Sequence, residues 1–368
     1  MADTNFSAVD HLHMAHALRL AELGLFTTQP NPRVGCVIAH GEQAVGSGWH
    51  RKAGEPHAEV HALREAGERA RGATAYVTLE PCAHHGRTPP CADALIEAEV
   101  ARVVVAVEDP FPQVAGRGMT KLREAGIEVQ VGLMREAARE LNIGFFSRIE
   151  RGRPWVRVKL AMSLDGRTAL ATGESKWITS AAAREDVQRW RARSSAVLTG
   201  SGTVLADNPR LTVRLDEPHA LPTRVVLDRL LRTPRGAQVL DGQMPTLILH
   251  GPGVTPDSRF AQVECVATAE IGHSFDLAAV LKILAEHGCN EVQVESGPTL
   301  CGSLVAAGLA DELLIYVAPV LLGNHAMPLL GLPALMDMSK RWSLHLRELR
   351  QVGPDIRLTL RPQDAGAP

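Results

Sequence analysis

The sequence predicts an α/β protein with two domains. Three observations lead to this prediction: the length, the alternation of short apolar strands with helices, and a polar segment near the middle. At 368 residues, the chain exceeds the size at which a single hydrophobic core is usual. The segment from Arg148 to Pro154 is charged and contains glycine and proline, which is typical of a domain boundary. We expect a flexible extension over residues 1–10 and domains over residues 11–150 and 154–364.

Helices and short strands alternate in the expected first domain. Apolar residues recur at helical spacing from Val9 to Leu23, and Gly24 is placed to end this helix. Two apolar stretches around a Gly41-Glu42 turn predict a hairpin over residues 34–39 and 45–49. A helix is then expected to begin at His57. The remaining expected elements are strand 75–79, helix 92–98, strand 102–107, helix 119–125, strand 128–131 and helix 135–146.

A second α/β run follows the polar segment. We expect one helix after an N-cap at Thr179 or Ser180, and another over residues 277–287 with Asp276 as its N-cap. The last expected strand leads into a glycine-rich segment over residues 295–303 and then into a helix. The expected strands cover residues 156–161, 196–199, 224–227, 246–250, 263–267 and 291–294.

One short group of residues predicts a metal site. His57-Ala58-Glu59 is followed by Pro81-Cys82 and, after eight further residues, by Cys91. One imidazole and two thiolates give zinc three ligands and leave a fourth position for water, which is typical of a catalytic zinc. Cys91 stands near the start of a predicted helix, where the helix dipole stabilises a thiolate. We therefore expect one Zn²⁺ on His57, Cys82 and Cys91.

Glu59 is the expected catalytic residue. Two residues after His57, it can stay off the metal and move protons between bound water and substrate, as in zinc deaminases. The pattern thus favours hydrolytic deamination by a zinc-activated hydroxide. His61 shares a helix face with His57, but the two cysteines complete the ligand set without it. The loop between the cysteines, residues 83–90, is longer than in that motif and adds a cation and two imidazoles, which suits an anionic substrate.

Composition argues against several other classes of protein. The net charge is −2, from 39 basic and 41 acidic residues, and aromatic residues make up 4%, which argues against nucleic-acid binding. No run of about eighteen apolar residues and no signal-peptide pattern occurs, so we expect no membrane partner. Six cysteines in a chain of this length indicate a reducing compartment. We predict a cytoplasmic protein that acts on a small molecule.

Two segments of the second half suit phosphate binding. The segment from Gly297 to Gly302 stands between a strand and a helix, where backbone N–H groups can bind phosphate. It does not match the dinucleotide pattern G-x-G-x-x-G, and an ordinary strand-to-helix turn is the alternative. The polar loop from Thr203 to Arg214 contains two arginines, which either bind phosphate or lie in solvent.

Several segments together resemble the family of bifunctional riboflavin-biosynthesis deaminase/reductases. They are H-A-E-V-H-A-L, E-P-C-A-H-H-G-R-T-P-P-C, S-L-D-G-R-T, W-I-T-S, T-V-L-A-D-N-P-R-L-T-V-R and E-S-G-P-T-L. The resemblance extends over residues 12–360 and includes the long cysteine loop, which is particular to this family among zinc deaminases. It implies a cytidine-deaminase-like α/β/α sandwich followed by a dihydrofolate-reductase-like α/β domain.

The resemblance also implies two reactions. The first domain would deaminate 2,5-diamino-6-ribosylamino-4(3H)-pyrimidinone 5′-phosphate. The second would reduce the ribosyl group of the product with NADPH, giving 5-amino-6-(5-phosphoribitylamino)uracil. The implied contacts of the deaminase substrate are Asn31, His50, His84 and Arg87. For Asn31, which stands between two prolines, a turn role is the alternative. We also expect a homo-oligomer.

For the reductase, the resemblance implies two sets of contacts. The cofactor contacts are Ala161, Trp177, Thr203, Asp207, Arg229, Gly297, Pro298, Thr299, Leu300, Cys301, Gly302 and Ser303. The substrate contacts are Lys159, Ser175, Arg191, Leu211, Arg214 and Glu295. Lys159 or Asp207 would manage the proton, with a structural or phosphate-facing cation as the alternative for Lys159. Arg229 replaces the smaller polar residue that is common in the family, so it either meets the 2′-phosphate of NADPH or points to solvent.

Two other functions would use the same zinc ligands. A tRNA or nucleoside deaminase with an appended domain predicts a basic groove or a two-residue spacing between the cysteines, and the sequence has neither. A non-enzymatic zinc module predicts four protein ligands, of which His84 or His85 could be the fourth.

Overall fold

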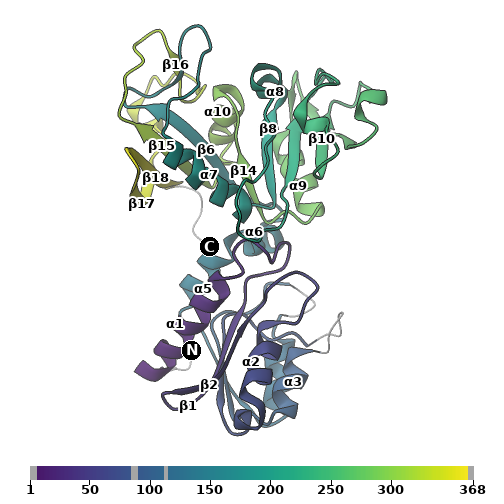
Figure 1. The fold of residues 1–368 in the computed structure, drawn as a ribbon, viewed down its shortest axis with the longest axis vertical. Helices are drawn as coiled ribbons and strands as arrows, with labels where there is room; N and C mark the ends of the chain where they lie inside the picture. Colours follow the sequence, from purple (N-terminus) through teal and green to yellow (C-terminus); the bar gives the residue numbers. More distant parts are fainter. Residues whose placement is uncertain (1–5, 84–89, 112–114, 364–368) are drawn as a thin grey trace. The chain divides into compact units, whose positions relative to one another are not determined.

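The computed structural model describes residues 6–83, 90–111 and 115–363, which form two compact units, Met1–Arg151 and Gly152–Pro368 (Figure 1). Helix α1 (Ala8–Glu22) includes residues 8–10, which we expected in the N-terminal extension. Its N-cap Ser7 and Asp10 form a capping box, and this local signal explains the earlier start. The polar segment expected at the boundary is helical as far as Arg151, because α6 (Ile143–Arg151) continues into it.

The sheet of the first unit has the strand order β2-β1-β3-β4-β5. The strands are β1 (Gly35–His40), β2 (Gln43–Trp49), β3 (Thr74–Val77), β4 (Arg102–Val105) and β5 (Glu128–Val131). The predicted hairpin is present as β1 and β2. Strand β1 is antiparallel to β2 and to β3, whereas β3, β4 and β5 are parallel. Strands β2 to β5 therefore run in one direction, so the segments that follow them leave the sheet at the same edge.

Helices cover both faces of this sheet. Helices α2 (Ala58–Ala66), α3 (Cys91–Glu97) and α4 (Arg117–Glu124) pack on one face, and α1, α5 (Arg135–Leu141) and α6 pack on the other. Successive strand residues serve the two cores in turn: Val103 and Val105 lie in the first, and Val104 lies in the second. This confirms the predicted α/β/α sandwich.

The helix predicted over residues 135–146 is divided at Asn142. The side-chain oxygen of Asn142 accepts the backbone N–H of Arg33 at 2.8 Å, and its amide nitrogen donates to the Arg33 carbonyl at 2.9 Å. Asn142 has φ −110°, outside the helical range. These hydrogen bonds fix the start of α6 to the segment before β1, and that segment contains Asn31.

Two glycines of β2 determine how closely α2 approaches the sheet. A Cβ at Gly46 would lie 2.2 Å from the carbonyl oxygen of Ala62, and a Cβ at Gly48 would lie 2.6 Å from that of Ala58. Helix α2 therefore rests on the backbone of β2. Because His57 is the N-cap of α2 and Glu59 lies in its first turn, this contact also fixes the position of both side chains.

The second unit has a larger sheet in the order β11-β10-β9-β8-β14-β6-β15-β18-β17. Neighbouring strands are parallel along the part of this order that runs from β11 through β10, β9, β8, β14 and β6 to β15. Strand β18 is antiparallel to β15, and β17 is antiparallel to β18. The sequence pattern did not predict β15, β17 or β18. The strands are β6 (Trp155–Ser163), β8 (Ala196–Gly200), β9 (Thr223–Leu227), β10 (Thr246–His250), β11 (Glu264–Ala267), β14 (Glu291–Val294), β15 (Glu312–Ala318), β17 (Leu344–Val352) and β18 (Asp355–Pro362). Two short antiparallel pairs lie outside it: β7 (Arg167–Ala169) with β16 (Met327–Pro328), and β12 (Glu270–Ile271) with β13 (Ser274–Phe275).

Helices also cover this second sheet. Helices α9 (Leu277–Glu286) and α10 (Pro298–Ala306) pack on one face, and α7 (Ala181–Arg193) and α8 (Ser201–Asp207) pack on the other. Ser180 and Asp276 are the N-caps of α7 and α9, as predicted. The expected polar loop is helical up to Asp207, and the expected glycine-rich turn is the start of α10, because Pro298 favours the first helical position. No helix within the described ranges could cross a membrane.

We predict that Gly46→Ala destabilises the first unit, because its methyl group would overlap the α2 backbone at Ala62. Overpacking of this kind costs about 1–3 kcal/mol, which denaturant unfolding would measure. Gly253→Ala is the control, since a Cβ there meets nothing within 4 Å. Equal stability of the two variants would contradict the role given to Gly46.

Candidate active sites

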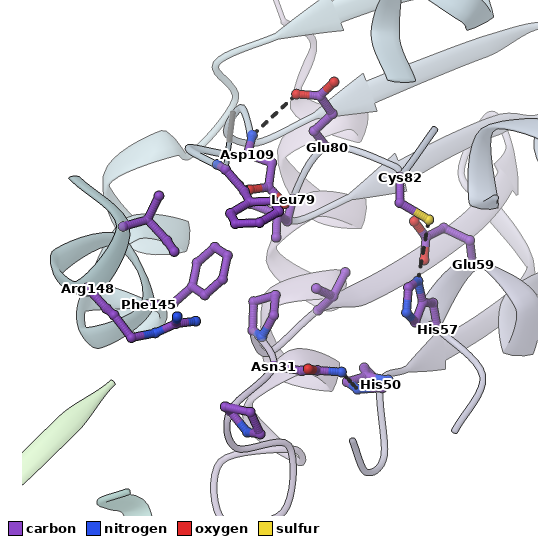
Figure 2. Close-up of a pocket in the computed structure, with 15 residues that line it drawn as sticks. Asn31, His50, His57, Glu59, Leu79, Glu80, Cys82, Asp109, Phe145 and Arg148 are labelled. Carbon is purple, nitrogen blue, oxygen red and sulfur yellow. Dashed lines mark hydrogen bonds between the residues drawn. The ribbon is translucent and has the colours of Figure 1, made fainter. Parts of the chain in front are cut away.

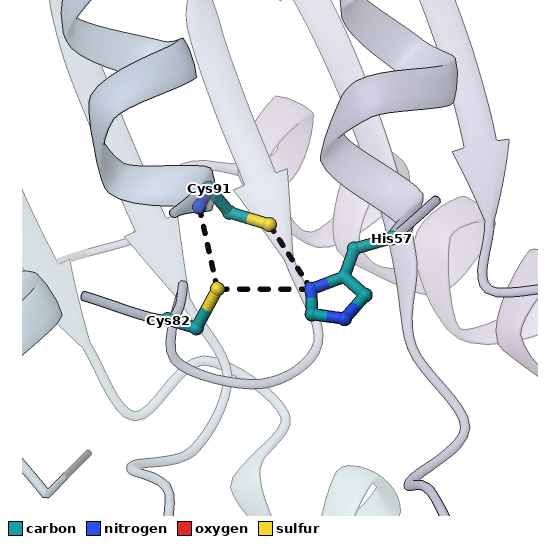
Figure 3. Close-up of side chains that lie close together, drawn as sticks. All are labelled: His57, Cys82 and Cys91. Carbon is teal, nitrogen blue, oxygen red and sulfur yellow. Dashed lines mark hydrogen bonds between the residues drawn. The ribbon is translucent and has the colours of Figure 1, made fainter. Parts of the chain in front are cut away.

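The three predicted zinc ligands lie together in the first unit (Figure 3). The ligand atoms of His57, Cys82 and Cys91 are all within 4.8 Å of one another. His57 Nδ1 lies 3.2 Å from the Cys91 sulfur and 3.7 Å from the Cys82 sulfur. Tetrahedral zinc, with bonds of roughly 2.0–2.3 Å, places its donor atoms about 3.5 Å apart. The donor set and its spacing therefore fit zinc, and among the described residues no second cluster of this kind occurs.

The three ligands stand at the starts of two helices and in the segment that follows a strand. His57 is the N-cap of α2, Cys82 follows β3, and Cys91 is the first residue of α3. The N–H of Cys91 donates to the Cys82 sulfur at 3.3 Å, and the N–H of Ala92 donates to the Cys82 carbonyl at 3.1 Å. The side-chain hydrogen bond with Cys91 lowers the pKa of Cys82 to about 4, with further help from His57 and the Cys91 N–H. Cys91, through its side chain and, to a smaller extent, its N–H group, thus favours a thiolate at Cys82.

Glu59 lies beside the ligands and is 3% exposed (Figure 2). Burial raises the pKa of its carboxyl group. Its Oε2 has no hydrogen-bond partner among the residues that the structure describes. A buried carboxyl group with a raised pKa and an unpaired oxygen can accept a proton near neutral pH and return it.

A cavity of about 320 Å³ opens beside these residues (Figure 2). Asn31 and His50 line it as expected, and Asn31 Nδ2 lies 3.2 Å from His50 Nε2. Burial lowers the pKa of His50, so its ring is neutral at pH 7 and offers one donor and one acceptor. His84 and Arg87, the other expected substrate contacts, lie outside the described residues.

The cavity has further lining residues that the sequence analysis did not single out: Glu80, Asp109, Phe111, Phe145, Arg148 and Ile149. A usable signal existed for the acidic pair, since Glu80 and Asp109 each come shortly after a predicted strand that ends at this edge. For the residues of α6 there was no local signal. Their place depends on the contact between Asn142 and Arg33, which are far apart in the sequence.

In the second unit, predicted site residues gather where three neighbouring parallel strands end. Lys159 and Ala161 lie on β6, Thr203 lies in α8 directly after β8, and Glu295 follows β14. Ligands of open α/β sheets bind at this carboxyl edge. The hydroxyl groups of Thr203 and Ser296 are 3.4 Å apart, so the segments after β8 and β14 are in contact.

An ion pair joins two of the predicted substrate contacts. The guanidinium of Arg191 donates to both oxygens of Glu295, at 2.6 and 2.8 Å, and to the carbonyl of Thr212 at 2.8 Å. Burial alone would raise the pKa of Glu295, but the adjacent Arg191 outweighs it and lowers the pKa to about 2. Burial lowers the pKa of the nearby Lys159. The ion pair with Arg191 keeps Glu295 ionised. Beside it, the ammonium group of Lys159 gives up its proton more readily than an exposed lysine does.

The other predicted reductase contacts differ in exposure. Trp177 is 69% exposed, and the neighbouring Lys176 lies 3.5 Å from Asp207. Arg229 lies 3.9 Å from Glu270, so it has an acidic neighbour on the protein. Of the remaining contacts outside α10, Ser175 is half-buried, Leu211 is buried and Arg214 is exposed.

The residues expected to contact the cofactor through α10 do not all reach the surface. Gly297, Thr299 and Ser303 are exposed, and Pro298 and Leu300 are half-buried, whereas Cys301 and Gly302 are buried. Gly302 packs on the chain at Gly331, where a Cβ would lie 2.4 Å from a carbonyl oxygen. A ligand could thus meet the N-terminal residues of α10 directly, while Cys301 and Gly302 face the protein interior.

Two family models match the chain, one in each of the two structural units. Residues 7–107 match the cytidine and deoxycytidylate deaminase zinc-binding region, and residues 154–358 match the RibD C-terminal domain. The protein is therefore a two-domain enzyme that unites a cytidine-deaminase-like zinc domain with a dihydrofolate-reductase-like reductase domain.

Relatives over the whole length give the family. The riboflavin biosynthesis protein RibD of Escherichia coli is 51% identical over 364 residues, covering 95% of this chain and 99% of that protein. Acinetobacter baumannii RibD has a TM-score of 0.91 and 45% identity, covering 97% of this chain and 99% of that one. A 33% identical structure from Thermotoga maritima, with a TM-score of 0.86 over 96% of this chain and 99% of that one, is described as a diaminohydroxyphosphoribosylaminopyrimidine deaminase/5-amino-6-(5-phosphoribosylamino)uracil reductase. The chain belongs to the RibD family of bifunctional deaminase/reductases in riboflavin biosynthesis.

We predict that Glu295→Gln changes the acid stability of the second unit. The pKa of Glu295 is about 2 rather than the usual 4.5, so its ion pair contributes fully above pH 4.5 and is lost as the pH falls towards 2. This shift corresponds to roughly 3 kcal/mol. The variant should be less stable at pH 7, and its stability should fall less steeply between pH 4.5 and 2. Denaturant unfolding at several pH values would measure this, and parallel pH profiles would contradict it.

Proposed function

We propose that the first unit deaminates 2,5-diamino-6-ribosylamino-4(3H)-pyrimidinone 5′-phosphate and that the second unit reduces the ribosyl group of the product with NADPH. One observation supports this most directly: His57, Cys82 and Cys91 lie within 4.8 Å of one another, and Glu59 lines the same cavity. A three-ligand set beside a buried carboxyl group suits hydrolytic chemistry better than a structural zinc module, which uses four protein ligands.

In the deaminase, His57, Cys82 and Cys91 would hold the zinc ion. When bound, zinc lowers the pKa of a coordinated water to near neutrality and so supplies a nucleophile. Glu59 would take a proton from the attacking water and return protons to the substrate, so that ammonia leaves. Its raised pKa and unpaired Oε2 support this role.

Other residues of the cavity would orient the deaminase substrate. Asn31 and His50, which contact each other in the cavity wall, would hydrogen-bond the pyrimidine. The phosphoribosyl arm needs cations, for which Arg87 and His84 are the proposed residues from the sequence. The cavity of about 320 Å³ falls within the size range of small-molecule sites.

In the reductase, the carboxyl edge of β6, β8 and β14 would bind NADPH and the ribosyl substrate. NADPH supplies the hydride, and the protein supplies orientation and phosphate binding. We assign cofactor contacts to Ala161, Trp177, Thr203, Asp207, Arg229 and residues 297–303. Substrate contacts are assigned to Lys159, Ser175, Arg191, Leu211, Arg214 and Glu295. The lowered pKa of Lys159 supports it as the residue that manages the proton.

The location and the assembly of the protein also belong to this proposal. All six cysteines are free thiols, which suits a reducing cytoplasm. Leu346 and Leu349 of the edge strand β17, with Ile356 of β18, form an exposed apolar face. We propose that a second copy of the chain covers this face. The homo-oligomer itself stays a prediction.

The decisive experiment incubates the purified protein with the diaminopyrimidine phosphate, with and without NADPH. We expect ammonia release in both cases, and formation of the reduced ribityl product only when NADPH is present. Glu59→Gln should keep its zinc and its reductase activity but lose ammonia release by at least about 100-fold, because the proton carrier is gone. Ammonia release at an unchanged rate would refute the role of Glu59.

We further predict that Cys82→Ser abolishes deamination but preserves reduction of the already deaminated intermediate, because the two sites share no residues. Steady-state NADPH oxidation with that intermediate would measure the reductase. Arg191→Lys is the reciprocal variant, because lysine cannot make the bidentate contact of Arg191 with Glu295. It should impair reduction but not deamination. Loss of both activities in a folded Cys82→Ser protein would show that the sites are not independent.

A further inference from the structure

Glu80, two residues before the zinc ligand Cys82, is a buried carboxylate with four backbone donors. Glu80 is only 4% exposed. Oε1 accepts the N–H groups of Gly118 and Met119, at 3.0 and 3.4 Å. Oε2 accepts those of Gly116 and Asp109, at 3.0 and 3.3 Å, and the contact with Asp109 is drawn in Figure 2.

Three of these four donors belong to the start of α4. Gly116 is its N-cap, and Gly118 and Met119 are its second and third residues. The first N–H groups of a helix have no partner within the helix, and the helix dipole favours an anion there. Gly116 has no side chain that could cap α4. The cap is supplied instead by Glu80, from a distant part of the sequence.

The backbone contact between α4 and the segment of Glu80 is equally close. A Cβ at Gly118 would lie 1.8 Å from the carbonyl oxygen of Pro81, the residue between Glu80 and Cys82. Glycine therefore allows α4 to rest on the Pro81 peptide while its N–H groups bind Glu80. A shift of α4 or of this segment would break hydrogen bonds and packing together.

Cys82 is thus held between two helix starts. On one side, Glu80 and Pro81 fix the segment before Cys82 to α4. On the other side, the sulfur and the carbonyl of Cys82 accept N–H groups from Cys91 and Ala92 at the start of α3. Glu80 also binds the N–H of Asp109, so the same carboxylate connects the zinc ligand to another part of the cavity wall.

We propose that Glu80 is a positioning residue of the deaminase site, which keeps Cys82 and the Asp109 segment in the arrangement that zinc and substrate require. This inference rests on the proposed zinc-dependent deamination. Residues behind metal ligands typically affect metal affinity or activity by about 10–100-fold. In this role Glu80 acts through the backbone N–H groups of α4 and Asp109, and it makes no contact with the donor atoms of the metal ligands.

Glu80→Gln tests the proposal, because it keeps the size of the side chain but replaces one acceptor oxygen with a donor. Glu108→Gln is the matched control, since Glu108 is an exposed glutamate next to Asp109, whose N–H group binds Glu80. Zinc affinity is measured in the full chain by competition with a chelating dye. The absorption bands of the Co²⁺-substituted protein report the geometry of the thiolate ligands. Deaminase and reductase rates and thermal unfolding are measured alongside.

We expect Glu80→Gln to bind zinc at least about 10-fold more weakly, to shift the Co²⁺ bands and to slow deamination, with reduction unchanged. Glu108→Gln should match the unmodified protein in every readout. A lower melting temperature with unchanged zinc affinity and unchanged Co²⁺ bands would overturn the proposal, because Glu80 would then be only a helix cap. If Glu80→Gln does not fold, Glu80→Asp keeps the charge and must still bind zinc more weakly than Glu108→Gln.

The same experiment separates failure of this inference from failure of the proposed function. If the unmodified protein binds zinc but releases no ammonia, the proposed deamination fails. The zinc affinities and Co²⁺ bands of the variants would still decide the role of Glu80.

Discussion

Both sites depend on one constraint: parallel strands of a sheet end at the same edge. In the first unit, His50 follows β2, Cys82 follows β3 and Asp109 follows β4, and all three line one cavity. In the second unit, the segments after β8 and β14 meet beside β6. Residues beyond a strand end are released from the packing of the sheet, so they can be selected for chemistry while the strands keep the core.

The same chemical group has three roles in this protein, according to what surrounds it. The carboxylate of Glu80 is saturated by backbone N–H groups and anchors a helix. That of Glu295 is neutralised by Arg191, so it stays ionised. That of Glu59 is buried with one oxygen unpaired among the described residues, so its pKa rises. Hydrogen bonds, an opposite charge and burial are the physical causes that separate these roles.

The predictions that succeeded rest on local patterns. Helix caps at Ser180 and Asp276, the hairpin and the ligand set of His57, Cys82 and Cys91 are readable from neighbouring residues. The strands that the sequence pattern did not predict depend instead on contacts with other strands. Strand β17 is almost entirely exposed and rich in charged residues, and it exists because it pairs along its length with β18. Such pairing depends on the partner strand more than on its own residue pattern.

The sequence by itself determined the chemistry of the zinc site, because the type, order and spacing of its ligands are properties of short segments. Tertiary structure alone decided what surrounds those ligands. The wall formed by Phe145 and Arg148 depends on where α6 packs, and the partners of Glu80 depend on where α4 begins. These contacts join residues that are far apart in the chain, so their energies come from packing and from hydrogen bonds that no local pattern encodes.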